Sequence, residues 1–251
     1  MVTSRFGGVS TGDCASFNFS YARDTNREAV DENFRRAAGV FGTTSDAFVC
    51  SDQTHTTNIR RVEKEDAGKG VTKEKDYRDV DGLITNVPGL ILGTFYADCV
   101  PLLFVDPVHH AIGCSHSGWR GTVGEMGKKT VEAMREAYGS RPEDIFAAIG
   151  PSICQDCYEV GKDVAEPFEK LFSQERYQDV SLKNILTEKV NGKYQLDLWR
   201  ANEAILLGTG IVKEHLSMTD ICTCCNPSYL FSHRASKGRR GNLAAFLMLK
   251  Q

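Results

Sequence analysis

Side chains that commonly bind zinc or copper lie at the ends of neighbouring predicted strands. The stretch Leu92–Gly121 predicts a strand, a break, a buried strand, a turn, a further strand and the start of a helix. Cys99 lies in the break and His116 follows the last strand, while His55 lies in a polar segment after the predicted strand Phe48–Cys50. Each residue alone is better explained as a buried thiol or a structural histidine. Together they indicate a site, because sites are commonly built on loops at strand ends.

Two histidines and a cysteine suit zinc chemistry. Zn²⁺ accepts this set and keeps a fourth position for water in catalytic sites, where the bound water ionises near neutral pH. Zinc deaminases of nucleobases add an acidic residue that moves protons, and Asp98 could be that residue here. In a further interpretation Cys99 is a nucleophile and His55 or His116 is its base, and this alternative stays open.

Copper is the alternative metal for the same ligands. A blue-copper centre also uses two histidines and a cysteine, but it needs a weak axial ligand. None of the five methionines is obviously placed for that role, and six histidines are too few for a multicopper oxidase. The residues therefore favour zinc over copper.

Predicted strands and helices alternate around these candidate ligands. Leu102–Val105 is an apolar run that ends at Asp106-Pro107, and Ala111–Ser115 is the next predicted strand. A helical pattern follows over Val123–Tyr138. Because the sequence contains no repeat, low-complexity tract or linker, we expect one α/β domain spanning residues 1–251.

The remaining elements follow from the same kinds of pattern. A helix capped by Asp24 or Thr25 is expected to run to about Val40, and Asp197 is expected to cap another helix. The charge-dense residues 62–79 predict an exposed loop or hairpin, after which Asp81–Thr85 re-enters the core. Further predicted elements are the helix Asp163–Phe172 and the strands Ser16–Ser20, Ile145–Ile149, Met218–Thr223, Tyr229–His233 and Leu243–Leu249.

The nine cysteines are numerous, but their odd number and spacing do not match a disulfide framework. We therefore expect reduced thiols. Cys154 and Cys157 form a C-x-x-C that could bind a metal or carry out redox chemistry, yet no partner pair is evident at zinc-ribbon spacing. Cys222, Cys224 and Cys225 are expected to be buried strand and turn residues rather than ligands.

Charge and hydropathy argue against two classes of partner. The formal net charge is −3 and the pI is about 6.1, so nothing indicates a general surface for nucleic acid or an anionic membrane. No apolar run approaches the length of a membrane span, and the N-terminus has no apolar signal region. We therefore expect a cytoplasmic protein.

Six motifs together resemble the multicopper polyphenol oxidase or laccase-domain family, whose members are also called laccase-domain purine nucleoside phosphorylases. The resemblance runs from Arg5 to Leu249, and its motifs are QTH, ADCVPLLFVDP, HSGWRG, GPSICQDCYEVG, LDLWRANEAILLGTG and FSHR. It implies a single α/β/β/α sandwich domain. It also implies a zinc ion held by His55, Cys99 and His116.

The resemblance further implies activity on purine nucleosides and phosphate. The expected reactions are phosphorolysis of adenosine, inosine, guanosine and methylthioadenosine, and hydrolytic deamination of adenosine. One branch of the family is named peptidoglycan editing factor, so a cysteine-dependent hydrolase acting on peptidoglycan precursors is an alternative. A copper-binding polyphenol oxidase is the other alternative, an older attribution that these residues support little.

Arginines near the metal in the family pattern are the expected phosphate binders, because a guanidinium matches phosphate in a bidentate fork. They include Arg5, Arg120 and Arg234, although Arg120 could instead be a structural clasp. Asn18 and Asn202 are polar candidates for substrate binding. Where the family often has TGR, this chain has Arg240-Gly241-Asn242, so Arg239 or Arg240 would have to replace that arginine if it binds phosphate.

Overall fold

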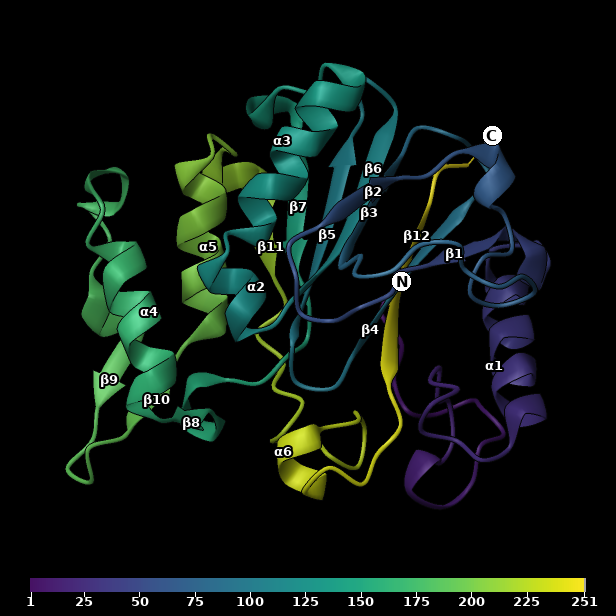
Figure 1. The fold of residues 1–251 in the computed structure, drawn as a ribbon, viewed down its shortest axis with the longest axis horizontal. Helices are drawn as coiled ribbons and strands as arrows, with labels where there is room; N and C mark the ends of the chain where they lie inside the picture. The colour runs from purple at the N-terminus through teal and green to yellow at the C-terminus, as the bar shows by residue number, and fades with distance from the viewer. Residues whose placement is uncertain (251) are drawn as a thin grey trace.

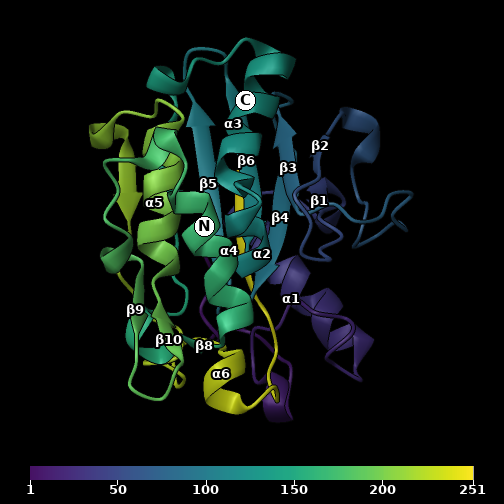
Figure 2. The same ribbon diagram turned by 60° about the vertical axis from the view of Figure 1, so that its left-hand side comes forward.

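The computed structural model describes residues 1–250, which form four layers in the order helix, sheet, sheet, helix (Figure 1). The turned view in Figure 2 shows α5 to the left of the central strands and α1 to their lower right. The predicted α/β class and the α/β/β/α layers are confirmed. The helices are α1 (Arg27–Val40), α2 (Trp119–Val123), α3 (Met126–Tyr138), α4 (Lys162–Phe172), α5 (Leu198–Gly208) and α6 (His233–Ser236).

A six-stranded sheet and a three-stranded sheet form the two inner layers. The larger sheet has the order β11 (Leu216–Met218), β7 (Phe146–Ile149), β5 (Val100–Asp106), β6 (Ala111–Ser117), β3 (Gly82–Thr85), β2 (Ile59–Arg61). The smaller sheet has the order β1 (Phe48–Cys50), β4 (Ile91–Tyr96), β12 (Leu243–Met248). A separate small sheet near α4 has the order β8 (Glu159–Val160), β10 (Tyr194–Leu196), β9 (Leu186–Glu188).

Apolar side chains fill each space between neighbouring layers. Strand β5 contributes to two of these cores, because both faces of the larger sheet are covered. Leu102 and Phe104 pack with the helices, whereas Leu103 and Val105 pack toward the smaller sheet. A third core lies between α1 and the smaller sheet, where Phe34 meets the rings of Phe48, Phe95 and Phe246.

A tight turn joins β5 to β6. The Asp106 carboxylate accepts hydrogen bonds from the backbone N–H groups of Val108 and His109, at 2.8 and 3.0 Å. It also contacts Nδ1 of His109 at 2.8 Å. From this turn the antiparallel pairing runs from Asp106 with Ala111 to Val100 with Ser117. The local Asp–turn chemistry thus fixes which residues face each other along the hairpin.

Several predicted elements are confirmed with small changes at their ends. The β1 strand has its predicted bounds, and β5, β6, β7, β12 and α4 lie within one to two residues of theirs. Asp197 caps α5, because its side chain accepts from the N–H of Arg200. The cap of α1 is Asn26 rather than Asp24 or Thr25, and Asp24 instead accepts from the N–H of Asn26.

Four predictions of secondary structure are wrong, and each has a local cause. The helix over residues 123–138 is divided, because Glu125 takes a left-handed φ of 58° between α2 and α3. Ser16–Ser20 forms no strand, since its backbone bonds to separate loops at Arg5 and Asn242. The strand expected over 218–223 ends at Met218, and residues 229–232 form a turn and loop before α6, with Tyr229 N–H bonded to the Asn226 carbonyl.

The charge-dense segment 62–79 is mainly loop, as predicted, but part of it is buried. Val62 and Asp66 are buried, and the Asp66 carboxylate pairs with Arg60 and Lys69. Within residues 1–250, no helix is both long enough and apolar enough to span a bilayer.

Candidate metal centre

Strand pairing brings Cys99 beside His116. In the β5–β6 hairpin Val100 faces Ser117 and Pro101 faces His116. Cys99 directly precedes β5, so its thiol lies next to the carboxyl end of β6. His116 is only 4% exposed, and Cys99 is partly buried.

The Asp81 carboxylate, which is fully buried, positions both histidines. Nδ1 of His116 donates to Asp81 Oδ1 at 2.8 Å, and the N–H of His55 donates to the same oxygen at 3.2 Å. Oδ2 accepts from the backbone N–H groups of Thr54 and Thr56, at 3.1 and 2.9 Å. One side chain therefore fixes the ring orientation of one ligand and the loop that carries the other.

The three candidate ligand atoms lie within 4.8 Å of one another. The two imidazole rings are edge to face, with centroids 5.0 Å apart. Because Nδ1 of His116 is bonded to Asp81, its Nε2 is the nitrogen left for a metal. A carboxylate behind a ligating histidine is the usual arrangement in zinc sites.

Gly118 leaves the space that this cluster occupies. A Cβ at residue 118 would lie 2.9 Å from Cys99 Sγ and 3.3 Å from Cδ2 of His55. The backbone φ of Gly118 is −74°, so the requirement for glycine here is steric rather than conformational.

The charges within the cluster favour a thiolate. Burial raises the pKa of Cys99, but the charge of His116 and hydrogen bonds from both histidines outweigh burial and lower the pKa to about 6. Burial lowers the pKa of His116, but Cys99 and Asp81 raise it to about 9. Zinc binds a thiolate and a neutral imidazole, so its binding would release the proton that His116 holds in the metal-free cluster, and the residue types fit the ion.

A cavity of about 470 Å³ opens onto the cluster. This volume lies within the range of pockets that hold small ligands. Five aromatic residues line it, namely Phe19, Tyr21, Phe34, Phe95 and Tyr96. Three cationic residues also line it, namely Arg23, Lys75 and Arg240.

Unlike Lys75, which pairs with Asp52, Arg240 has no carboxylate partner within residues 1–250. Its Nη1 contacts Asn242 and the Gly241 carbonyl, while its buried Nε has no hydrogen-bond partner. Burial and the charge of Arg23 lower the pKa of Arg240 to about 10. Among residues 1–250 no carboxylate forms an ion pair with it, so the cavity wall contains a guanidinium suited to an anion.

The structure places Asp98 and Arg234 together, beside the cluster rather than in the cavity wall. Asp98 Oδ1 accepts from Thr223 Oγ1 at 2.6 Å, and Oδ2 accepts from the N–H of Arg234 at 2.7 Å. The Arg234 guanidinium donates to the carbonyls of Cys157 and Glu159 at 3.1 Å. Both side chains thus hold loops in this conformation, and their catalytic and phosphate-binding roles stay predictions.

The other predicted binding residues are also separate from the cavity lining. Arg5 donates to the carbonyls of Ala15 and Pro227 and lies over the ring of Phe231. Arg120 is exposed and stacks on Trp119, with its guanidinium carbon 4.2 Å from the ring centroid.

The two predicted asparagines are fully buried. Asn18 accepts from the N–H of Asn242 at 2.9 Å, next to the cavity wall. Asn202 on α5 bonds to Thr122 and to Ser117, and thereby joins the helices to β6. Any contact of either residue with substrate stays a prediction.

Several site residues were missed by sequence reasoning. The sequence predicts Asp81 only as the residue at which the chain re-enters the core, and nothing local indicates that its carboxylate faces His116. Gly118 stands in the HSGWRG motif, but nothing in the sequence indicates that it must leave space for Cys99. Arg23 and Lys75 belong to stretches that look like ordinary charged surface. Of these residues the sequence indicates only Arg240, because Arg240-Gly241-Asn242 stands where the family often has TGR.

Comparisons with known proteins agree on one family. A family model described as multi-copper polyphenol oxidoreductase laccase matches residues 1–250. The chain is 35% identical to the purine nucleoside phosphorylase YlmD of Bacillus subtilis, over 99% of this chain and 87% of that protein. It is 36% identical to the adenosine deaminase RL5 of an unknown prokaryotic organism, over 85% and 79% of the two chains. The solved structure of the hypothetical protein YfiH of Bacillus licheniformis has a TM-score of 0.93 and 31% identity, covering 99% of this chain and 91% of that one.

Proposed function

The chain belongs to the multi-copper polyphenol oxidoreductase laccase family, and we propose that it cleaves purine nucleosides with phosphate and also deaminates adenosine. The names of its relatives support both activities. The observation in this chain that carries the proposal is the cavity that joins a His–Cys–His cluster, an aromatic wall and the unpaired Nε of Arg240.

The proposed metal is zinc, held by His55, Cys99 and His116. When bound, such an ion supplies water that ionises near neutral pH, which is the chemistry needed to replace the amino group at C6 of adenine. Asp81 keeps His116 oriented with Nε2 available, and Gly118 keeps the space around the thiol free. These two residues support the ligand set without contacting substrate themselves.

Copper chemistry has less support. Blue-copper sites add a weak axial ligand, often methionine, and no methionine lines the cavity. Within residues 1–250, histidines gather with other potential ligands at this one cluster, whereas a multicopper oxidase needs several histidine-rich centres. A polyphenol oxidase activity is therefore not the function that we propose.

Phosphorolysis needs a place for an anion and a place for the purine. The reaction breaks the bond between the ribose C1′ and N9 of the base, and joins a phosphate oxygen to C1′. Arg240 supplies fixed positive charge for phosphate, with Arg23 close enough to lower its pKa. Phe95 and Tyr21 offer apolar ring surface for the purine. Gln53 bonds to both the N–H and the carbonyl of Phe95 and so holds that residue in place.

One assay tests the function. Purified, zinc-loaded protein is incubated with adenosine, with and without phosphate, and inosine, adenine and hypoxanthine are separated. We expect adenine that depends on phosphate, and inosine that does not. Methylthioadenosine, inosine and guanosine then define the range of phosphorolysis. If no purine nucleoside is converted while the metal site is full, the proposal is wrong and a hydrolase acting on peptidoglycan precursors becomes the next candidate.

The phosphate site has its own test. We expect Arg240→Ala to raise the KM for phosphate by about tenfold to a hundredfold, as for loss of a charge-assisted hydrogen bond, and to leave deamination nearly unchanged. Arg120→Ala is the matched control, because Arg120 is exposed and stacked on Trp119. If the KM for phosphate rises in Arg120→Ala and not in Arg240→Ala, phosphate binds at Arg120, as the HSGWRG motif predicts, and not at Arg240.

A further inference from the structure

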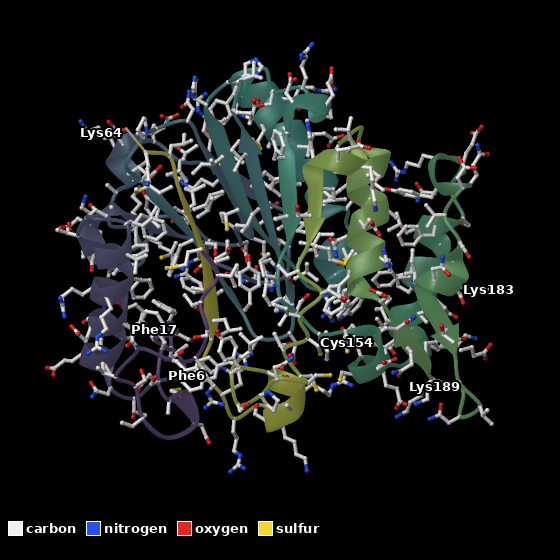
Figure 3. The ribbon with its side chains drawn as sticks, turned by 180° about the vertical axis from the view of Figure 1, so that it is seen from behind. Phe6, Phe17, Lys64, Cys154, Lys183 and Lys189 are labelled. Atoms are coloured by element: carbon white, nitrogen blue, oxygen red, sulfur yellow. The ribbon has the colours of Figure 1, made fainter. Side chains whose placement is uncertain are left out.

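Four cysteines from two loops meet at one end of the molecule. Cys154 and Cys157 lie in the loop after β7, and Cys222 and Cys225 lie in the loop after β11. Their sulfur atoms are all within 4.8 Å of one another. No partner pair stands at zinc-ribbon spacing from the first C-x-x-C, as the sequence indicates, but a pair from a loop far along the chain lies beside it. The expectation that Cys222, Cys224 and Cys225 are all buried is wrong, because Cys225 is exposed and Cys224 is only partly buried. In Figure 3, Cys154 lies near α6 in the lower part of the view.

We propose that this four-cysteine cluster is a second metal site, which binds Zn²⁺ and has a structural role. Sulfur–sulfur distances support a metal rather than disulfides. Cys225 Sγ lies 3.4 Å from Cys157 Sγ and 3.9 Å from Cys154 Sγ. A tetrahedral zinc with bonds of about 2.3 Å separates its sulfurs by about 3.8 Å, whereas a disulfide joins them at about 2.05 Å.

Backbone amides already point at one of the sulfurs. The N–H groups of Cys154 and Cys225 both donate to Cys222 Sγ, at 3.3 Å. Such donors stabilise a ligating thiolate, as other groups behind the ligands do in metal sites.

The two loops are joined independently of the cysteine side chains. Ser152 donates its N–H to the Ile221 carbonyl at 3.2 Å and accepts from the N–H of Thr223 at 3.1 Å. This bridge sets the two C-x-x-C segments side by side, so a metal would find the four ligands near their final positions.

The surroundings suit a closed, negatively charged centre. Zinc with four thiolates carries a net charge of −2, and the Arg234 guanidinium lies against the Cys157 carbonyl at 3.1 Å. Four protein ligands leave no position for substrate, which is typical of structural zinc. The loop contacts the first centre only indirectly, since Thr223, between two of the cysteines, donates to Asp98 rather than to a candidate ligand.

Zinc content measured by elemental analysis tests the proposal. Protein purified without chelator under reducing conditions should hold about two zinc ions per chain, one per cluster. Cys157→Ser/Cys225→Ser should lose one of them. Cys224→Ser is the matched control, since this neighbouring cysteine lies outside the cluster, and it should keep both. His116→Ala should keep the zinc of the four-cysteine cluster, which separates this proposal from that for the first centre.

Two further measurements keep the test decisive if the double variant does not fold. Wild-type protein reconstituted with Co²⁺ should show the strong visible and thiolate charge-transfer absorption of tetrahedral cobalt with four sulfurs. Thiol titration of denatured protein without reductant should find all nine cysteines free. Equal zinc content in wild type and double variant, a missing cobalt–thiolate spectrum, or thiols lost to disulfides would each overturn the proposal.

Discussion

The His–Cys–His cluster and the four-cysteine cluster are assembled in different ways. Two proposed ligands of the first, Cys99 and His116, are adjacent because β5, which Cys99 precedes, is paired residue by residue with β6. The ligands of the second come from loops joined by a single isolated bridge at Ser152. A buried carboxylate, Asp81, orients the first set, whereas backbone N–H groups support the second.

In the two proposals made above, this difference separates a site for chemistry from a site for stability. Three protein ligands beside a cavity leave room for substrate, whereas four ligands close the coordination of zinc. Loss of the first metal should therefore abolish activity with little effect on folding. Loss of the second should weaken the fold near β7 and β11 with little effect on chemistry. Four substitutions test this division.

The largest effect is expected for His116→Ala. Removing a ligand of the first centre removes several kcal/mol of transition-state stabilisation, so kcat/KM for adenosine deamination should fall by about a thousandfold. Steady-state kinetics and zinc content measure the change together. A variant that keeps activity within tenfold of wild type would remove the basis for calling this centre catalytic.

Asp81→Asn should have the next largest effect. An amide cannot replace a carboxylate that accepts from His116 and from three backbone N–H groups, and loss of such a group lowers metal affinity by about tenfold to a hundredfold. Chelator competition measures the affinity. Asp79→Asn is the control, because exposed Asp79 accepts from Thr54 and does not contact a ligand. Equal affinities in the two variants would show that the buried carboxylate does not support the metal.

Gly118→Ala should disturb the same centre by steric contact alone. Its methyl group would meet Cys99 Sγ at 2.9 Å, and a displacement of a few tenths of an ångström should cost about tenfold in metal affinity. Gly39→Ala on α1 has open space around the new methyl and should stabilise the fold by about 0.5–1 kcal/mol. Unchanged affinity in the first variant would mean that the ligand cluster adapts more freely than the close packing implies.

The smallest effect on activity, but a clear effect on stability, is expected for Cys157→Ser. If free zinc exceeds its dissociation constant a hundredfold, the lost site lowers the free energy of unfolding by about 2.7 kcal/mol. Because Cys157 belongs neither to the His–Cys–His cluster nor to the cavity lining, kcat/KM should change by less than about threefold. Thermal unfolding with and without zinc measures the first quantity, with Cys224→Ser as control. Loss of activity without loss of stability would reverse the roles of the two clusters.

Sequence reasoning located the first cluster because its signals are local. Cys99, His116 and His55 each follow or precede a strand with a recognisable apolar pattern, and family motifs cover all three. Asp81 was missed because its role depends on the pairing of β3 with β6, which no local pattern reveals. The sequence does not indicate that the second C-x-x-C is the partner of the first. The two loops lie together because β7 pairs with β11, and no local pattern predicts that pairing.

The fold shows the same division between local and distant information. Strands with continuous apolar runs, such as β5 and β12, were predicted nearly to their ends. Segments whose backbone bonds reach distant loops, such as Ser16–Ser20, were misassigned as strands. The cavity could not be predicted either, because Arg23, Lys75 and Arg240 converge from three separate parts of the chain.

The turn at Asp106 has a consequence for how insertions would act. Both faces of β5 are apolar, so sliding the strand by one residue would exchange Leu102 and Phe104 for Leu103 and Val105 and still bury hydrophobic side chains. Such a slip would therefore change the buried apolar surface little. The hydrogen bonds of the Asp106 turn are the local feature that opposes it. One residue added to this turn, at the opposite end of the hairpin from Cys99, would shift the cysteine away from His116 while leaving a largely folded protein. Variation in the length of this turn should thus be tolerated far less than its surface position suggests.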